Sequence, residues 1–142
     1  MTKNKVLITG GAGFIGSHIV EKLLENNYNV IIIDNLSSGS IENIPNSDTL
    51  KFYQLNIEKD DLELVFHKEA PDYVIHLAAQ TSVNFSISHP YYDANMNVMA
   101  SIKLLELCKK YNIRKFITAS SAAIYGNPKY LPIDENHPTE PM

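Results

Sequence analysis

The stretch VLITGGAGFIGSHIVEKL, residues 6–23, places four glycines within seven positions. Glycine has no side chain to pack, and it destabilises regular structure by roughly 0.5–1 kcal/mol relative to alanine. The apolar run at residues 6–9 predicts a β-strand, and the apolar spacing in residues 14–25 predicts a helix. A glycine-rich turn between a strand and a helix is typical of a loop that binds phosphate groups.

The glycines match the G-x-G-x-x-G dinucleotide pattern at Gly11, Gly13 and Gly16, and an overlapping G-x-x-G-x-x-G pattern begins at Gly10. One glycine allows the sharp turn, another lets the backbone approach a pyrophosphate, and the last lets the helix pack on the strand. The diphosphate then lies at the helix N-terminus, where free N–H groups favour negative charge. A purely structural turn is the alternative. A P-loop does not fit, because Ser17 occupies the position of its lysine.

Asp34 follows a second apolar run, residues 30–33, and lies 18 positions after Gly16. A carboxylate at this place accepts hydrogen bonds from the adenosine ribose of a dinucleotide, and it repels the 2′-phosphate of NADP. No lysine or arginine occurs between Lys22 and Lys51 to bind that phosphate. These residues predict NAD as the cofactor in preference to NADP. An aspartate that only caps a turn is the alternative.

The remaining pattern alternates between strands and helices. We expect loops at residues 35–48 and 78–88, further strands at 52–55, 73–77 and 116–118, and helices at 60–69 and 90–111. This order predicts a doubly wound α/β fold of the Rossmann type, with about five parallel strands and helices on both faces. Ligands bind such sheets beyond the carboxyl ends of the strands. On the longest helix, a stripe at spacings of three and four predicts the packing face: Tyr91, Ala94, Val98, Ile102, Leu105 and Cys108.

Composition limits the classes of function. The chain has 142 residues, 44% of them hydrophobic, and a net charge of −4, which predicts one domain without a broad nucleic-acid or membrane surface. Its single cysteine, Cys108, favours a reducing compartment, and we expect a cytoplasmic protein. The five histidines show no metal-ligand spacing, so no metal site is predicted. His76, inside a strand, is expected to be a hydrogen-bonded core residue.

Four motifs occur in one order: TGGAGFIG (9–16), DNLSSG (34–39), HLAAQ (76–80) and SSAAIYG (120–126). On these motifs the whole chain resembles the extended short-chain dehydrogenase/reductases, and within them the UDP-glucose 4-epimerases and related nucleotide-sugar epimerases. The resemblance implies an NAD-dependent enzyme that oxidises C4 of a UDP-sugar, lets the ketone turn over and returns hydride to the opposite face. It also implies a homodimer formed through the helix at residues 90–111.

The resemblance further implies which residues bind the cofactor. Asp34 and Asn35 would hold the adenosine ribose, and Asn56 and Ile57 would line the adenine. Asn97 corresponds to the family's helix asparagine near the cofactor, with Asn95 as the alternative assignment. The full implied set is Gly10, Gly13, Phe14, Ile15, Gly16, Asp34, Asn35, Leu36, Ser37, Ser38, Gly39, Asn56, Ile57, Leu77, Ala78, Ala79, Gln80, Asn97 and Ala119.

Leu77, Ala78 and Ala79 would pass beneath the cofactor ribose and the nicotinamide. Small residues at the end of a strand suit a flat ligand, although tight packing against a helix explains the two alanines equally well. The best-known UDP-glucose 4-epimerases have a lysine in the loop that follows, whereas this chain has Gln80, Thr81 and Ser82. The identity of the sugar therefore stays open.

Ser121 matches the family's active-site serine, which hydrogen-bonds the reacting oxygen of the sugar. A hydroxyl that only bonds its own turn is the alternative, and we expect it of Ser120 more than of Ser121. The 4,6-dehydratases of the same family place Asp-Glu directly after the active-site hydroxyl residue, where this chain has Ala122 and Ala123. A methyl group cannot transfer a proton, so the sequence favours epimerisation over dehydration.

The family's general base is the tyrosine of a Tyr-x-x-x-Lys pair. Beyond Ser121, Tyr125 and Lys129 match the bare spacing, but this tyrosine belongs to the Ile-Tyr-Gly turn, and packing is its expected role. Residues 135–142 resemble the segment that precedes the catalytic helix in the family. We therefore expect an NAD-binding domain at residues 1–142 that ends before the Tyr-x-x-x-Lys helix and the nucleotide-sugar-binding domain, and that binds NAD without turnover. A non-catalytic, redox-sensing or regulatory NAD-binding module is the alternative.

Overall fold

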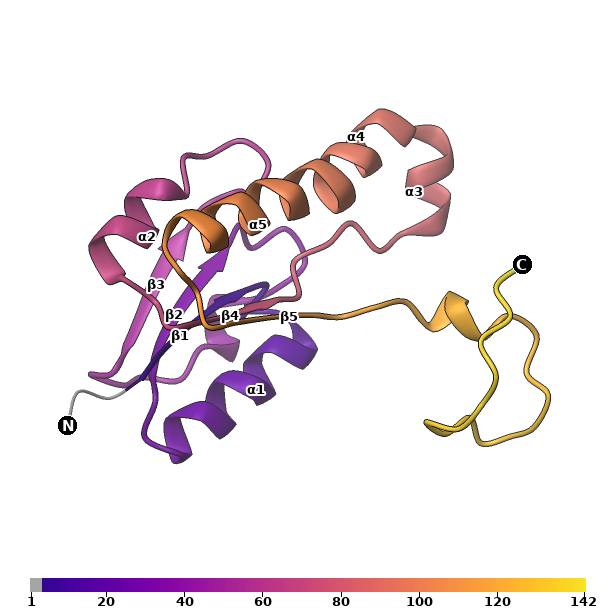
Figure 1. Cartoon of the computed structure of the whole chain (residues 1–142), viewed down its shortest axis with the longest axis horizontal. Coiled ribbons are helices and arrows are strands. Elements are labelled where there is room, and N and C mark those ends of the chain that lie inside the picture. The colour runs from indigo at the N-terminus through magenta and orange to yellow at the C-terminus, as the bar shows by residue number, and fades with distance from the viewer. Residues whose placement is uncertain (1–3) are drawn as a thin grey trace.

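The computed structural model describes residues 4–142 and contains one parallel β-sheet. Its five strands lie in the order β3-β2-β1-β4-β5 (Figure 1). This arrangement confirms the predicted Rossmann-type fold with about five strands. The bounds are β1 (Lys5–Thr9), β2 (Asn29–Asp34), β3 (Leu50–Gln54), β4 (Tyr73–His76) and β5 (Lys115–Thr118).

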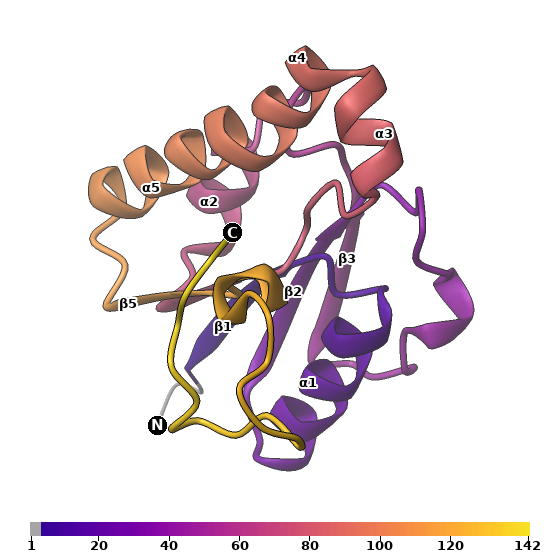
Figure 2. The ribbon, with the colours of Figure 1, turned by 90° about the vertical axis from the view of Figure 1, so that its right-hand side faces the viewer.

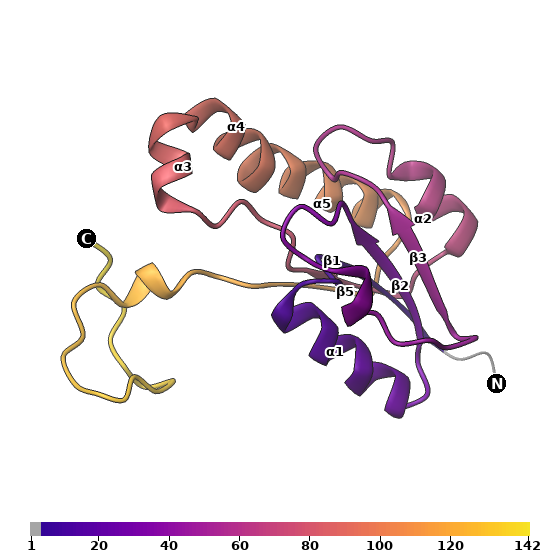
Figure 3. The ribbon, with the colours of Figure 1, turned by 180° about the vertical axis from the view of Figure 1, so that it is seen from behind.

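Helices cover both faces of the sheet (Figures 1 and 3). On one face, α1 (Phe14–Glu25) packs over Val6 and Ile8 of β1. On the other face, α2 (Glu63–Glu69) and α5 (Ala100–Lys110) pack over Leu7. Successive residues of β1 therefore point into two separate cores, which explains why its sequence is apolar throughout.

The helix predicted at residues 90–111 is present as a nearly continuous element. It consists of α4 (Pro90–Ala94), a π-helical turn η2 (Asn95–Met99) and α5. Pro90 is its first residue, as its missing N–H group favours. A shorter helix, α3 (Val83–Ser88), lies within the segment predicted as a loop, and the Ser82 hydroxyl caps it by accepting from the Phe85 N–H group. This helix has no buried residue, and its apolar residues do not recur with the period of a helix.

The predicted packing face of the long helix is wrong in most positions. The buried residues are Met96, Ala100, Leu104, Leu107 and Cys108, so of the predicted stripe Cys108 lies in the core. Tyr91, Val98, Ile102 and Leu105 are 81%, 54%, 44% and 48% exposed. The helix is apolar on two sides, and spacing alone does not say which side meets the sheet.

Two element boundaries also differ from the prediction. The helix predicted from residue 60 begins at Glu63, because Asp60 and Asp61 use their carboxylates as caps for backbone N–H groups of Asn56 and Glu63. The third strand spans Leu50–Gln54, two residues earlier at its start than expected. The predicted loop at residues 35–48 contains a single 3-10 turn, η1 (Ile41–Asn43).

Residues 119–142 leave the sheet after β5 and project away from it (Figures 1 and 2). They contain a 3-10 turn, η3 (Ala122–Tyr125), and an ion pair of 2.8 Å between Lys129 and Glu140. His137 is buried between the rings of Tyr125 and Tyr130. Across residues 4–142, no helix has both the length and the apolar character needed to cross a membrane.

Candidate functional site

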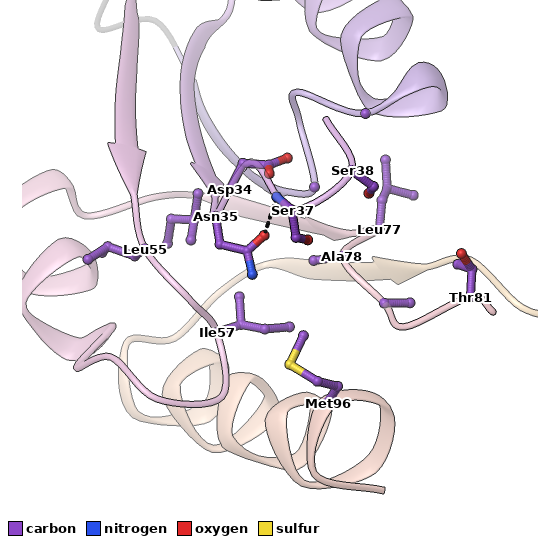
Figure 4. Close-up of a pocket in the computed structure, with 14 residues that line it drawn as sticks. Asp34, Asn35, Ser37, Ser38, Leu55, Ile57, Leu77, Ala78, Thr81 and Met96 are labelled. Atoms are coloured by element: carbon purple, nitrogen blue, oxygen red, sulfur yellow. Dashed lines mark hydrogen bonds between the residues drawn. The ribbon is translucent and has the colours of Figure 1, made fainter. Parts of the chain in front are cut away.

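A pocket lies at the carboxyl ends of β1, β2 and β4 (Figure 4), where the fold predicts a ligand site. One side is polar, with carboxylate, amide and hydroxyl side chains, and the other is apolar. Such a combination is typical of sites for small organic ligands. Among the described residues, the pocket is lined by Gly10, Gly13, Ile33, Asp34, Asn35, Ser37, Ser38, Leu55, Ile57, Leu77, Ala78, Ala79, Thr81 and Met96.

The glycine loop shows which glycines the fold itself requires. Gly10 has a φ of +76°, and a Cβ atom there would lie 2.7 Å from the backbone nitrogen of Ala78. A Cβ atom at Gly16 would collide with the carbonyl oxygen of Gly10. At Gly13, by contrast, the nearest atom is the Gly10 oxygen at 3.4 Å, and the backbone has an ordinary extended conformation. The protein has room for a side chain at Gly13, and that side chain would lie in the pocket.

The same loop leads into the N-terminus of α1, where Gly13 is the N-cap and no side chain caps the helix. The first-turn N–H groups of Phe14, Ile15 and Gly16 have no partner inside a helix, and they suit an anionic ligand. The side chains of Phe14 and Ile15 are exposed and do not line the pocket. The predicted role of these two residues therefore rests on their backbone.

Asp34 joins the end of β2 to the glycine loop. One carboxylate oxygen, Oδ2, accepts from the backbone N–H of Ala12 at 3.0 Å, and the other, Oδ1, accepts from the N–H of Leu36 at 2.8 Å. A carboxylate has about four acceptor sites, so both oxygens can still accept from a ribose hydroxyl. Neither lysine nor arginine is among the pocket-lining residues within the described chain.

Four residues that line the pocket are absent from the predicted set: Ile33, Leu55, Thr81 and Met96. The sequence predicts strand positions for Ile33 and Leu55, a place in the loop after the fourth strand for Thr81, and a place in the long helix for Met96. Met96 reaches the pocket from the π-helical turn η2, opposite Ile57 (Figure 4). Nothing in the local sequence around Met96 signals this position, because it depends on how the helix lies over the sheet.

Several predicted residues support the pocket without lining it. The Asn56 side-chain oxygen accepts from the N–H groups of Glu58 and Lys59, so this residue shapes the turn beside Ile57. A Cβ atom at Gly39 would lie 2.7 Å from the backbone of Ala12, so this glycine permits close packing. Gly16, Leu36, Gln80, Asn97 and Ala119 are likewise absent from the lining.

A buried hydrogen-bonded chain lies beneath the end of β4. The Ser101 hydroxyl donates to the Asn97 carbonyl oxygen at 2.8 Å, so it accepts from Nε2 of His76 at 3.0 Å. Nδ1 of His76 then accepts from the Thr9 hydroxyl at 2.6 Å, and burial lowers the pKa of this histidine. Thr9 in turn accepts from the N–H groups of Leu77 and Ala78. The prediction of a satisfied core histidine at position 76 is confirmed.

The segment after β4 is attached to the long helix through amide side chains. Asn97 Oδ1 accepts from the backbone N–H of Gln80 at 2.8 Å, and Asn97 Nδ2 donates to the backbone oxygen of Gln80 at 2.9 Å. The side-chain amide groups of Gln80 and Asn97 also donate, through Nε2 and Nδ2, to Oδ1 of Asp93. Ala79 and Thr81, on either side of Gln80, line the pocket.

Ser121 lies outside the pocket, at the N-cap of η3 within residues 119–142. Its hydroxyl oxygen accepts from the N–H of Ala123 at 3.2 Å, so the turn bond expected of Ser120 belongs to Ser121 instead. The reason is that Ser121, not Ser120, is the N-cap of η3. Tyr125 and Lys129 do not pair, since Lys129 binds Glu140 and Tyr125 packs on His137. Residues 4–142 show no cluster of His, Cys, Asp and Glu suited to a metal ion.

A family model and known relatives both match nearly the whole chain. Residues 7–142 match the family model described as GDP-mannose 4,6 dehydratase. A putative UDP-glucose 4-epimerase from Methanocaldococcus jannaschii is 49% identical over 138 residues, which are 96% of this chain and 45% of the relative. The chain thus spans about half the length of the curated relatives it matches.

Solved structures resemble this fold closely. The UDP-glucose 4-epimerase of Thermotoga maritima, determined with UDP-glucose, matches with a TM-score of 0.83 and 48% identity over 97% of this chain and 45% of that one. The UDP-glucose 4-epimerase of Thermus thermophilus, in complex with NAD, also has a TM-score of 0.83, with 40% identity over 96% of this chain and 44% of that one.

Proposed function

The chain belongs to the GDP-mannose 4,6 dehydratase family, and we propose that within this family it is the NAD-binding part of a nucleotide-sugar 4-epimerase. The proposed substrate pair is UDP-glucose and UDP-galactose. The similarity to UDP-glucose 4-epimerases supports this reaction. Ala122 and Ala123 support it as well, since a dehydratase needs an acid and a base at these positions.

The observation that carries the proposal is the bare backbone at Gly13 beside the carboxylate of Asp34. A Cβ atom at Gly13 meets only the Gly10 oxygen, at 3.4 Å, so the fold itself does not require glycine there. A diphosphate that approaches the backbone would require it. We assign the diphosphate to the first-turn N–H groups of α1, and the adenosine ribose to Asp34 and Asn35. The apolar side chains of Ile57 and Met96 suit the adenine. Bound NAD would supply the hydride acceptor that a 4-epimerase needs.

In the proposed enzyme, Ser121 hydrogen-bonds the reacting oxygen of the sugar. The turn bond to Ala123 is compatible with this role, because the hydroxyl oxygen accepts there and its own proton stays available to donate. The general base and the UDP-binding residues are proposed to lie outside residues 1–142. Lys129 is paired with Glu140 and Tyr125 packs on His137, so these two residues do not form the family's tyrosine–lysine pair. This chain is therefore proposed to bind NAD without epimerase turnover.

That arrangement of Tyr125 and Lys129 also favours the second candidate, a non-catalytic NAD-binding module on the same fold. The two candidates share the cofactor site and differ in whether a UDP-sugar reacts.

For the epimerase, we further propose a cytoplasmic homodimer that associates through the exposed face of the long helix. Burial raises the pKa of the Cys108 thiol to about 11, which disfavours its thiolate form.

Isothermal titration of the purified 142-residue chain with NAD tests the shared part of the proposal. Saturable one-site binding that Gly13→Val abolishes is expected, and absence of binding by the wild-type chain would overturn the proposal. The second arm fuses this chain to the C-terminal part of the Thermotoga maritima epimerase, one of its close structural relatives. Interconversion of UDP-glucose and UDP-galactose by the fusion, lost in Ser121→Ala, supports the epimerase. An inactive fusion that still binds NAD and UDP-glucose supports the non-catalytic module.

A further inference from the structure

The segment of residues 78–82, which follows β4, forms one wall of the pocket through Ala78, Ala79 and Thr81. It belongs to neither a strand nor a helix, so side chains must hold its backbone in place. Asn97 does this at one point, since its single amide group binds both the N–H and the C=O of Gln80. The wall is therefore attached to the long helix at Gln80, directly between the lining residues Ala79 and Thr81.

Asp93 determines how that attachment is oriented. Its Oδ1 atom accepts from Nδ2 of Asn97 at 3.1 Å and from Nε2 of Gln80 at 2.8 Å. Hydrogen bonds to a carboxylate are stronger than those between neutral groups, and two of them converge on one oxygen here. The Gln80 side chain is fixed in turn at its other end, where Oε1 accepts from the N–H of Ser82 at 2.5 Å.

The helix geometry makes this arrangement possible. Asp93 lies in α4 and Asn97 four residues later in the π-helical turn η2, so the two side chains lie on the same side of the helix. The same π turn carries Met96, which lines the pocket across from Ile57 (Figure 4). Wide turns of this kind are frequent at functional sites. One turn of helix thus presents Met96 to the pocket and Asn97 to its wall.

We propose that Asp93 is a positioning residue for the nicotinamide end of the cofactor, acting through Asn97 and Gln80. This inference rests on the proposed function, and it takes from the family resemblance that Leu77, Ala78 and Ala79 would lie beneath the nicotinamide and its ribose. Asp34 and the glycine loop, at the adenosine and diphosphate end, have no hydrogen bond to Asp93 among those of the described residues. Loss of the Asp93 carboxylate should therefore weaken the binding of NAD and spare the binding of ADP.

The experiment measures the dissociation constants of NAD and of ADP for the wild-type chain, Asp93→Ala and Asp93→Asn. In Asp93→Ala, NAD should bind at least tenfold more weakly, whereas ADP should bind within twofold of wild type. Asp93→Asn should restore most of the NAD affinity, because its amide oxygen can accept from both donors. The exposed Asp48 provides the matched control, and Asp48→Ala should change neither constant.

Amide hydrogen exchange without any nucleotide gives a second readout. The Gln80 N–H group should exchange at least tenfold faster in Asp93→Ala, while the N–H groups of Leu77 and Ala119 keep their wild-type rates. Equal weakening of NAD and ADP, or unchanged NAD affinity together with unchanged Gln80 exchange, overturns the inference and leaves the proposed function intact. A wild-type chain that binds neither nucleotide overturns the proposed function, and this inference with it.

Discussion

The carboxylate of Asp34 accepts a hydrogen bond from the backbone N–H of Ala12 at 3.0 Å, which joins the end of β2 to the glycine loop. The residue thus has a structural role in addition to its proposed contact with the ribose. It keeps Gly10 and Gly13 at the pocket, while its second oxygen orders the turn at Leu36. The acidic end of β2 and the glycine loop consequently act as one unit.

The first prediction concerns the choice of cofactor. Because Asp34 is buried at the pocket and no lysine or arginine lines it within the described residues, NAD should bind at least tenfold more tightly than NADP. Tenfold corresponds to about 1.4 kcal/mol. The double variant Asp34→Ala, Ser37→Arg should narrow the ratio, as measured by calorimetric titration of both nucleotides. Equal affinities in the wild-type chain would contradict the assignment of Asp34.

A second prediction separates the glycines of the loop. Gly13→Val should abolish NAD binding and leave the melting temperature close to wild type, because the fold has room for a side chain there. Gly16→Ala serves as the contrasting variant. Its Cβ atom collides with the Gly10 oxygen, so the free energy of unfolding should fall by about 1–3 kcal/mol or more. Normal NAD affinity in a folded Gly13→Val chain is the result that would rule out this role.

The third prediction is a pH dependence of stability. Burial lowers the pKa of His76 in the folded chain, so between that value and the unfolded value near 6.5 the unfolded state binds more protons. The contribution of neutral His76 is therefore complete above about pH 6.5 and decreases as the pH falls through this window. Urea unfolding between about pH 7 and pH 5 should show the loss in wild type and a flatter profile in His76→Asn. His67→Asn, at an exposed histidine of α2, should behave like wild type.

The fourth prediction concerns the exposed face of the long helix, formed by Tyr91, Val98, Met99, Ile102 and Leu105. Contiguous apolar surface on a helix favours burial against a partner, and a second copy of the chain is the partner we expect. Sedimentation velocity should show a dimer for wild type and a monomer for Leu105→Lys. Leu64→Lys, at an exposed leucine of α2 outside this face, is the control and should remain dimeric. A monomeric wild-type chain at high concentration would argue against this interface.

Much of the fold could be predicted because the patterns that indicate its strands and helices lie within short stretches of sequence. Glycine spacing, an apolar run and helical periodicity identified β1 and α1, and α1 has the predicted bounds. The start of α2 was predicted too early, because carboxylates in the first turn of a helix and carboxylates that cap the preceding loop look alike in sequence. The apolar residues of α3, Val83, Phe85 and Ile87, alternate along the sequence, so they do not show the period of a helix.

The residues of the site also fall into two groups, those with a local sequence pattern and those placed by tertiary packing. Those next to a strand end with a recognisable pattern, such as Gly10, Gly13, Asp34 and Ala78, were predicted and line the pocket. Met96 and Thr81 could not be predicted, since their place depends on how η2 and the segment of residues 78–82 meet. The attachment of Gln80 to Asp93 and Asn97 spans up to 17 positions along the chain and has no local signal.

The sequence by itself thus determined the strand–loop–helix unit, the parallel α/β fold and the acidic residue at the end of β2. Each of these depends on backbone preference and on apolar periodicity within about twenty residues. Only the tertiary structure decided which apolar side of the long helix is buried, which residues complete the pocket and which serine caps η3. Those outcomes depend on the packing of α4, η2 and α5 over the sheet, and two apolar faces on one helix are equivalent until a sheet lies beneath one of them.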